Sequence, residues 1–376
     1  MTFAPLVGIG PELPPEREAR YARTARLPGF GMDAQRRVRN ARVLVVGAGG
    51  LGSAVLPGLA AVGFGTIGIV DGDRVEWSNL PRQTVHGPAD VGRSKADSAA
   101  EAVALLDDET AVVVHDTMLT SANAREIIAG YDLVLDGSDN FPTRYLVNDA
   151  GVLAGVPVVW GAVHRFGGQV GVSWAAEGPQ YRDLFPVPPE PGSVPNCAEA
   201  GVLPSVCAVI GGLMVSEAVK LVTGTGEPLV GRVVVHDALS GGFRELAYER
   251  DAEAEPVTRL IDYDLFCGVS ATMTPGELSA RLEAGEPFTL IDVREPWEAD
   301  LASIPGSLLV PLAVVQRDPA GVAARLGDDP LVIVCHHGPR AEVARRALDT
   351  AGAPGLVLAG GIDAWARDID GSLARY

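Results

Sequence analysis

A glycine-rich turn between a strand-like run and a helix-like run constrains the fold of this chain more than any other feature. Residues 41–47 read as a buried strand, and Gly47, Gly49 and Gly52 form the turn that follows. Glycines at such a turn let backbone amides and a helix N-terminus approach a phosphate. Strand-like and helix-like runs go on alternating to about residue 149. The alternation predicts an α/β fold with a doubly wound parallel sheet.

The length of 376 residues fits two domains, because domains usually run to about 100–200 residues. A long apolar helix is expected at about 205–222, ended by Gly224. A capping box at Thr274 and Glu277 starts a new helix after an acidic stretch that contains proline. We therefore assign an N-terminal helical segment at 1–40, a first domain at 41–249, a linker at 250–271 and a second, small α/β domain at 272–376.

The composition narrows the classes of partner. Lys and Arg total 30 and Asp and Glu total 48, a net charge of −18, so we expect neither nucleic-acid binding nor membrane attachment. The first 16 residues lack the positive region of a secretory signal, and no run approaches the roughly 20 apolar residues of a membrane span. We expect a cytoplasmic protein. Arg17, Arg20, Arg23 and Arg26 recur at every third position and read as a solvated helix face.

Polar residues after the glycine turn decide between two nucleotides. Asp71 ends the next strand, 24 residues after Gly47, and suits a ribose hydroxyl of either NAD or ATP. An NAD-dependent oxidoreductase is therefore one alternative. The segment that follows adds charged and amide groups that hydride transfer does not require, and Arg82 and Lys95 suit a triphosphate. Asp139 ends a later strand, where a carboxylate is placed to hold Mg²⁺.

This set of residues resembles the ubiquitin-activating superfamily, in its bacterial form of ThiF/MoeB-type adenylyltransferases for the sulfur carriers of molybdopterin and thiamin synthesis. The resemblance covers about residues 16–248 and implies a Rossmann-like sheet that binds ATP. The reaction implied is attack of a carrier carboxylate on the α-phosphate, with Arg82 and Asp139 taking part in catalysis. By position, the resemblance implies phosphate contacts from Gly47, Gly49, Gly50 and Gly52, a ribose contact from Asp71, further nucleotide contacts from Asp73, Asn79, Arg82, Gln83 and Lys95, and a Mg²⁺ contact from Asp139.

The same resemblance extends to an N-terminal motif and to a cysteine. Arg20-Tyr-Ala-Arg23 is similar to a motif whose second arginine reaches the nucleotide of a neighbouring subunit, which implies a homodimer with Arg23 acting in trans. Cys197 matches a family cysteine beside the carrier tail, where a thiolate forms an acyl disulfide or exchanges thiols; a buried bystander is the alternative. Cys207, in the apolar helix, is expected to pack in the core. Zinc-binding relatives have Cys-x-x-Cys pairs that this chain lacks, so no zinc is predicted.

A cysteine at the end of a strand-like run marks the chemistry of the second domain. Cys335 is followed by two histidines, a glycine, a proline and Arg340, and a helix-like run begins at once. Backbone amides and a helix N-terminus in that position favour a thiolate, which is a nucleophile and can carry a persulfide. Arg340 is expected to close this cradle. His336 and His337 read either as ordinary loop residues or as groups that tune the thiol.

With Asp292-Val-Arg294 and the run Gly360 to Trp365, this loop resembles a rhodanese over about residues 272–374. The two modules in this order resemble bacterial bifunctional adenylyltransferase and sulfurtransferase proteins. That resemblance implies activation of a small ubiquitin-like sulfur carrier at its C-terminal Gly-Gly, followed by sulfur transfer from a Cys335 persulfide to form a thiocarboxylate. The implied sulfur donor is thiosulfate or a cysteine desulfurase persulfide. Two alternatives stay open beside the oxidoreductase: a non-catalytic carrier-binding scaffold, and an enzyme that conjugates a protein modifier.

Overall fold

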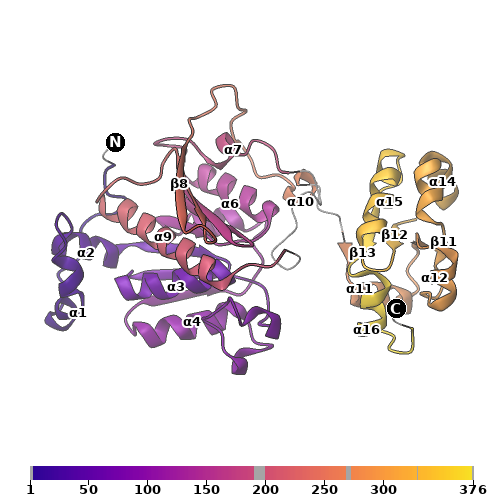
Figure 1. The fold of residues 1–376 in the computed structure, drawn as a ribbon, viewed down its shortest axis with the longest axis horizontal. Coiled ribbons are helices and arrows are strands. Elements are labelled where there is room, and N and C mark those ends of the chain that lie inside the picture. Colours follow the sequence, from indigo (N-terminus) through magenta and orange to yellow (C-terminus); the bar gives the residue numbers. More distant parts are fainter. Residues whose placement is uncertain (1–2, 190–199, 268–271, 328, 375–376) are drawn as a thin grey trace. The chain divides into compact units, whose positions relative to one another are not determined.

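The chain folds into two units, Met1–Cys267 and Gly268–Tyr376, in a computed structural model that describes residues 3–189, 200–267, 272–327 and 329–374. The segment 250–271, which the sequence analysis assigns to a linker, belongs in part to the first unit. Helix α10 (Tyr263–Phe266) packs against helix α6 (Phe141–Ala154) there, and the Tyr263 hydroxyl donates to Asp149 Oδ2 at 2.7 Å. The units are described separately below (Figure 1).

The first unit is built on one eight-stranded sheet in the order β3-β2-β1-β4-β5-β6-β7-β8. Strands β1 to β5 pair in parallel, which confirms the predicted doubly wound parallel sheet, whereas β5 to β8 pair antiparallel. Strand β8 was not predicted from the sequence. The strands are β1 (Arg42–Val46), β2 (Thr66–Val70), β3 (Ala111–His115), β4 (Leu133–Asp136), β5 (Val158–His164), β6 (Gly167–Ser173), β7 (Arg232–Asp237) and β8 (Gly242–Ala247).

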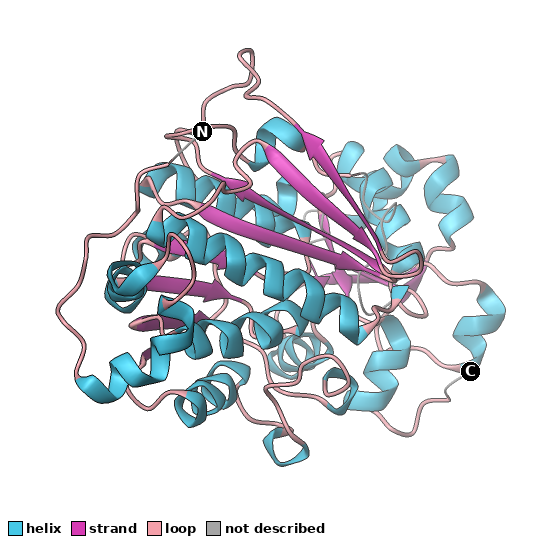
Figure 2. Ribbon diagram, turned by 60° about the vertical axis from the view of Figure 1, so that its left-hand side comes forward, coloured by secondary structure: helices cyan, strands magenta, loops and turns pink. Residues whose placement is uncertain are grey.

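Helices cover both faces of the central strands of this sheet (Figure 2). Residues of β1 alternate between the two resulting cores: Val43 and Val45 pack with the first set of helices, and Leu44 and Val46 pack with the second. A parallel strand buried on both faces needs such a continuous apolar run. The first set is α3 (Gly50–Val62), α4 (Lys95–Leu106) and α9 (Pro204–Thr223), and the second is α5 (Ala124–Ile128), α6, α7 (Tyr181–Leu184) and α10.

Helix α9 is the predicted apolar helix, and Gly224 ends it in the left-handed conformation as expected. Contrary to the sequence analysis, one run does approach a membrane span, because α9 has 20 residues and a mean hydropathy of 1.7 over its most apolar window. Within the first unit, 61% of that window is buried. Its contacts with α3, β5 and β6 make α9 a core helix of the described fold.

The N-terminal segment forms two helices, α1 (Pro15–Ala25) and α2 (Gly31–Asn40). The interpretation of Arg17 as part of a solvated face is wrong, because Arg17 is only 9% exposed. Its guanidinium forms ion pairs with Asp107 and Asp108, at 2.7 and 2.8 Å, and with Glu109 at 2.7 Å. A buried charge needs partners of this kind.

The second unit has a five-stranded parallel sheet in the order β11-β10-β12-β13-β9, again with helices on both faces. The predicted capping box is confirmed: Glu277 N–H donates to Thr274 Oγ1 at 3.2 Å, and Thr274 N–H donates to Glu277 Oε2 at 2.8 Å. The strands are β9 (Thr272–Met273), β10 (Thr289–Asp292), β11 (Leu308–Leu309), β12 (Leu331–Val334) and β13 (Gly355–Leu358), and the helices are α11 (Pro275–Ala284), α12 (Pro296–Leu301), α13 (Leu312–Arg317), α14 (Pro319–Leu326), α15 (Pro339–Thr350) and α16 (Gly361–Asp368).

Candidate functional sites

A pocket opens in the first unit at the carboxyl ends of β1, β2 and β4, on both sides of the point where the strand order reverses. Ligands of doubly wound sheets bind at this kind of position. The space between the lining atoms is about 840 Å³, and this volume includes room that is open to solvent. The predicted residues that line it are Gly47, Gly49, Gly50, Asp71, Asp73, Arg82, Gln83, Lys95 and Asp139.

The glycine turn forms the floor of the pocket. Gly47 has φ = +86°, a conformation that glycine adopts without strain. Gly52 does not line the pocket, but a Cβ at this position would lie 2.0 Å from the Gly47 carbonyl oxygen. Its lack of a side chain therefore allows α3 to start directly against the turn. Gly47 and Gly52 thus each need glycine for a different steric reason.

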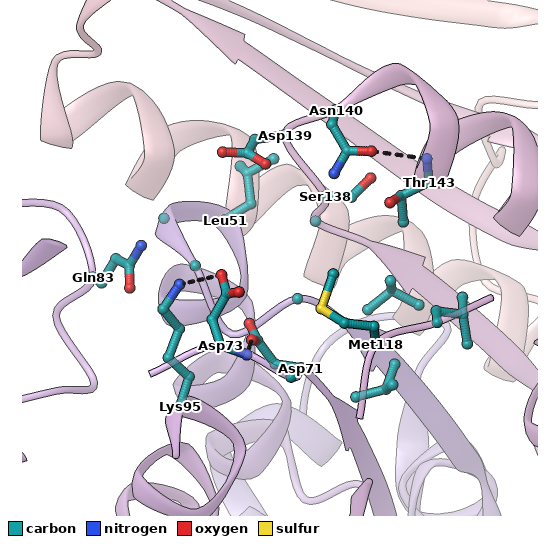
Figure 3. Close-up of a pocket in the computed structure, with 18 of the residues that line it drawn as sticks. Leu51, Asp71, Asp73, Gln83, Lys95, Met118, Ser138, Asp139, Asn140 and Thr143 are labelled. Atoms are coloured by element: carbon teal, nitrogen blue, oxygen red, sulfur yellow. Dashed lines mark hydrogen bonds and ion pairs between the residues drawn. The ribbon is translucent and has the colours of Figure 1, made fainter. Parts of the chain in front are cut away.

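Asp71 ties the glycine turn to the next loop. One carboxylate oxygen accepts from Ala48 N–H at 2.8 Å and the other from Asp73 N–H at 2.8 Å. Lys95, at the start of α4, holds its Nζ 2.8 Å from Asp73 Oδ2, and the Lys95 side chain is only 9% exposed. Figure 3 shows Lys95, Asp73 and Asp71 on one side of the pocket and Asp139 on the other. Cationic and anionic groups thus face the same space.

A short 3₁₀ helix, η1 (Trp77–Asn79), presents the next two predicted residues. The Asn79 carbonyl accepts from the backbone N–H groups of Arg82 and Gln83 at 3.1 and 3.0 Å, and Asn79 Oδ1 accepts from Glu76 N–H. Asn79 itself is buried and does not line the pocket. Gln83 is 3% exposed, and its Oε1 has no hydrogen-bond partner within the described part of the chain. A buried acceptor of this kind, on the pocket wall, is suited to a bound ligand.

The loop after β4 carries Asp139 on the pocket wall, with its side chain exposed. Asp136, at the end of the strand, is buried instead, and burial raises the pKa of its carboxyl although Arg144 opposes this. The Asp136 carboxyl accepts from Ser138 N–H at 2.9 Å, which shapes the loop. The run Asp-Gly-Ser-Asp-Asn therefore contains one carboxyl that orders the loop and one that faces solvent.

The sequence analysis missed several residues of this pocket. Thr117, Met118 and Leu119 follow β3 and line it, and Met118 is 57% exposed. Cys207 is buried, as predicted, but it also lines the pocket, and its Sγ lies 3.1 Å from where a Gly50 Cβ would be. That second role follows only from how α9 crosses α3.

His86 supports the glycine turn from beneath and was also missed. Its Nε2 lies 3.0 Å from the Ala48 carbonyl oxygen and its Nδ1 lies 2.9 Å from Ser98 Oγ. Because a carbonyl only accepts, Nε2 carries the proton. Burial lowers the pKa of His86, which favours this neutral form. The neutral ring then accepts from the Ser98 hydroxyl and fixes the turn on α4.

Two predicted residues stay outside this description of the pocket. Arg23 lies exposed on α1, and it is not among the residues that line the pocket. Cys197 lies outside the described residues. Where zinc-binding relatives are expected to have cysteine pairs, Arg182 of α7 forms an ion pair with Asp149 at 2.7 Å. Burial raises the pKa of the nearby Cys267 thiol to about 11.

The second site is the loop between β12 and α15. Cys335 is 1% exposed, and Gly338 N–H points at its Sγ at 3.0 Å. Ile362 N–H, in the first turn of α16, donates to the Cys335 carbonyl oxygen at 2.9 Å. A Cβ on Gly361 would lie 2.5 Å from that carbonyl oxygen, so the second glycine of the predicted Gly-Gly pair permits this contact. The loop is thus built around the predicted sulfur atom.

Arg340 stands beside this loop in an ion pair. Its Nη1 and Nη2 donate to the two carboxylate oxygens of Glu298 at 2.6 and 2.7 Å. The expectation that Arg340 closes the cradle therefore stays a prediction, and Glu298 is a partner that the sequence analysis did not identify. The rings of His336 and His337 stack with their centroids 3.9 Å apart. Asp292 and Arg294 pair with each other in the core of the unit.

In the first unit, the sheet places a glycine turn, a lysine and an exposed aspartate around one pocket, which defines an α/β nucleotide-binding module. In the second unit, the cysteine loop defines a sulfur-transfer module. The ThiF family matches residues 21–257, and a rhodanese-like domain matches residues 274–368. The chain belongs to the ThiF family and carries a rhodanese-like domain.

Curated relatives match both modules together. The chain is 46% identical to "Probable adenylyltransferase/sulfurtransferase MoeZ" of Mycobacterium tuberculosis, over 100% of this chain and 99% of that protein. It is 39% identical to "Adenylyltransferase and sulfurtransferase MOCS3" of Mus musculus, over 95% of this chain and 87% of that protein. Among solved structures, E. coli MccB matches with a TM-score of 0.57 at 19% identity, over 66% of this chain and 75% of that one. At this identity the last match bears on the fold alone.

Proposed function

We propose that this chain is an ATP-dependent adenylyltransferase for the C-terminal glycine carboxylate of a small ubiquitin-like sulfur carrier, and a sulfurtransferase that converts the adenylate to a thiocarboxylate. The observation that carries the proposal is the single pocket that gathers Gly49, Lys95 and Asp139 in a chain that also holds Cys335 in a rhodanese-like loop. Relatives that match the chain over nearly its whole length have both activities in their names.

In this proposal ATP occupies the pocket with its phosphates on the glycine turn. The N-terminus of α3 and the backbone amides of the turn favour the phosphate charge. Lys95, which forms an ion pair with Asp73, supplies positive charge, as does Arg82. Asp71 accepts a hydrogen bond from the ribose. The residues fit Mg²⁺, because that ion is usually held by one or two carboxylates together with substrate phosphates. Asp139 would hold this ion, and the bound ion would supply charge stabilisation at the α-phosphate.

The proposed sulfur transfer follows in balanced steps. A carrier carboxylate oxygen bonds to the α-phosphorus, and pyrophosphate leaves. The terminal sulfur of a Cys335 persulfide then attacks the acyl carbon and AMP leaves, which gives a carrier acyl disulfide on Cys335. A thiolate, for which Cys197 is the candidate in this chain, attacks the Cys335 sulfur and releases the carrier thiocarboxylate. The resulting disulfide is reduced by an external thiol, and thiosulfate or a cysteine desulfurase persulfide supplies the next sulfur.

We also propose a homodimer in which Arg23 acts on the nucleotide of the partner subunit. Its exposure on α1, away from the residues that line its own pocket, supports this assignment. Mixing an Arg23→Ala subunit with an Asp139→Ala subunit should restore adenylation, because one pocket in the mixed dimer then has both groups. Failure of the mixture to exceed the two parents would remove the trans role.

Three other functions receive less support. An NAD-dependent oxidoreductase explains the glycine turn and Asp71 but gives no role to Lys95, Asp139 or the Cys335 loop. A non-catalytic scaffold for a carrier protein leaves the same three features unexplained. Conjugation of a protein modifier to a target accounts for the first unit but not for the rhodanese-like domain.

Intact-mass spectrometry of a carrier ending in Gly-Gly tests the whole proposal. The carrier is incubated with the enzyme, ATP, magnesium, thiosulfate and a reductant, and we expect a mass gain that corresponds to one oxygen replaced by sulfur. Cys335→Ala should abolish the gain but leave pyrophosphate release. Lys95→Ala should lower pyrophosphate release by roughly a hundredfold or more, as loss of a transition-state contact does. Release of no pyrophosphate with any of several carriers would refute the adenylyltransferase assignment.

A further inference from the structure

Arg165 has a backbone conformation that L-amino acids rarely adopt. It lies in the turn between β5 and β6 with φ = +53°, and within the described chain it is the one non-glycine residue with positive φ. Glycine would adopt this conformation without strain, and eighteen glycines among the described residues do have positive φ. Strained positions that keep a large side chain are concentrated at functional sites. The side chain of Arg165 is therefore the feature to explain.

The surrounding structure holds this turn in place. Arg165 N–H donates to the Gly201 carbonyl oxygen at 3.0 Å, and the Arg165 carbonyl oxygen accepts from Leu203 N–H at 2.8 Å. These two bonds form a parallel bridge between Arg165 and Val202. The bridge fixes the backbone on both sides of the side chain, while Arg165 itself is exposed. A guanidinium that is exposed on a fixed backbone is well placed to bind a ligand.

The bridge lies at the pocket. Val163, two residues before Arg165, and Val202, its bridge partner, both line the nucleotide pocket. They come from the β5 side of the sheet, whereas Asp71 and Thr117 line the pocket from the ends of β2 and β3. A nucleotide on the glycine turn, with its ribose at Asp71, extends over β2 and leaves the β5 side for the second substrate.

We infer that Arg165 binds the C-terminal tail of the carrier protein at the mouth of the pocket. This inference rests on the proposed function, since it gives the carrier carboxylate a route to the α-phosphate along the β5 side. Because the terminal carboxylate itself goes to the phosphate, the guanidinium donates to backbone carbonyl oxygens of the tail just before it. The planar fork of arginine suits paired carbonyl acceptors. Phe166 and Leu203, 47% and 38% exposed, give apolar surface on either side.

The decisive variant is Arg165→Gly, because it removes the side chain and also relieves the backbone strain. We expect its KM for the carrier to rise by about tenfold or more, the loss typical of a charge-assisted hydrogen bond. Its KM for ATP should stay at the wild-type value, and its melting temperature should not fall, because the substitution relieves strain. Arg165→Lys should give an intermediate KM for the carrier, since it keeps the charge without the fork. Exposed Arg125 of α5 offers the control Arg125→Ala, which should match the wild type.

The measurement is carrier-dependent ATP–pyrophosphate exchange by the full chain, with a ubiquitin-like carrier ending in Gly-Gly and with a peptide of its last six residues. If Arg165→Gly keeps the wild-type KM for both probes, the inference is overturned and the proposed function still stands. Glycine would then only relieve the strain of a turn that has no part in binding. A raised KM for the whole carrier but not for the peptide would also overturn it, since the contact is then not with the tail. Absence of exchange in the wild-type chain would refute the proposed function and this role with it.

Discussion

At the scale of single residues, the absence of a Cβ at Gly52 is the most sharply testable feature. Because a Cβ at this position would lie 2.0 Å from the Gly47 carbonyl oxygen, Gly52→Ala must displace the glycine turn or the start of α3. We expect a loss of about 1–3 kcal/mol in the stability of the first unit, the usual cost of overpacking. Nucleotide affinity should fall by about tenfold or more with it, since the phosphate-binding amides move. Calorimetry and titration with a fluorescent ATP analogue measure the two effects.

Gly212 in α9 is the matched control for this substitution. It is also a helical glycine, but a Cβ there meets no atom within 4 Å. Gly212→Ala should keep nucleotide affinity and leave stability unchanged or raised by up to about 1 kcal/mol, because alanine favours the helix. Equal effects of the two substitutions would contradict the steric account of Gly52.

At the scale of elements, α1 is held to the rest of the first unit by the pair Arg17 and Asp107. The Asp107 side chain is fully buried but keeps the Tyr21 hydroxyl and the Glu109 N–H as partners, so Arg17→Met should cost about 1–3 kcal/mol at neutral pH, as loss of a charge-assisted hydrogen bond does. Arg20→Met, one turn along α1, removes an exposed bond to the Leu106 carbonyl oxygen and a contact with the Tyr21 ring, and should cost less than about 1 kcal/mol. Similar melting temperatures for the two variants would refute the buried role of Arg17.

The same pair predicts a dependence of stability on pH. Burial raises the pKa of Asp107, but hydrogen bonds from Glu109 N–H, the Tyr21 hydroxyl and Arg17 outweigh it and hold the pKa below the usual 3.8. A carboxyl with a lowered folded-state pKa stabilises the fold above its unfolded value and loses this effect as pH falls. The difference in stability between wild type and Arg17→Met should therefore be constant above about pH 5 and shrink below pH 3.8. A difference that grows on acidification would contradict this.

At the scale of the whole molecule, each unit has its own sheet and its own cores on both faces of it. We predict that residues 1–267 and 268–376 fold when produced separately, and that the first piece alone still releases pyrophosphate. At micromolar concentrations the mixed pieces should form thiocarboxylate at least about tenfold more slowly than the full chain does. In the full chain, a short linker supplies an effective concentration on the order of mM. Raising the second piece toward that concentration should restore the rate. Full activity of dilute pieces would show that the fusion has no kinetic role.

Much of this fold could be predicted where the local sequence pattern is strong, and elements with a weak pattern were missed. The apolar runs of β1, β2 and α9, the capping box at Thr274 and the cysteine loop depend on neighbours in sequence, so they were predictable. Strand β8 was missed because all its residues are exposed and it has no buried face to set a pattern. The extra roles of Cys207, His86 and Glu298 were missed because each depends on a residue far away in the chain.

The sequence by itself determined the order of the elements, the two modules and the residue types at each strand end, because these follow from short-range periodicity and from motifs whose spacing the chemistry requires. Only the tertiary structure decided which of those residues meet. It placed nine predicted residues in one pocket and left Asn79, Gly52 and Arg23 outside its lining. It also buried Arg17 and put Arg165 in a strained turn at the pocket. Such contacts depend on how helices and strands pack across long separations, which no local pattern specifies.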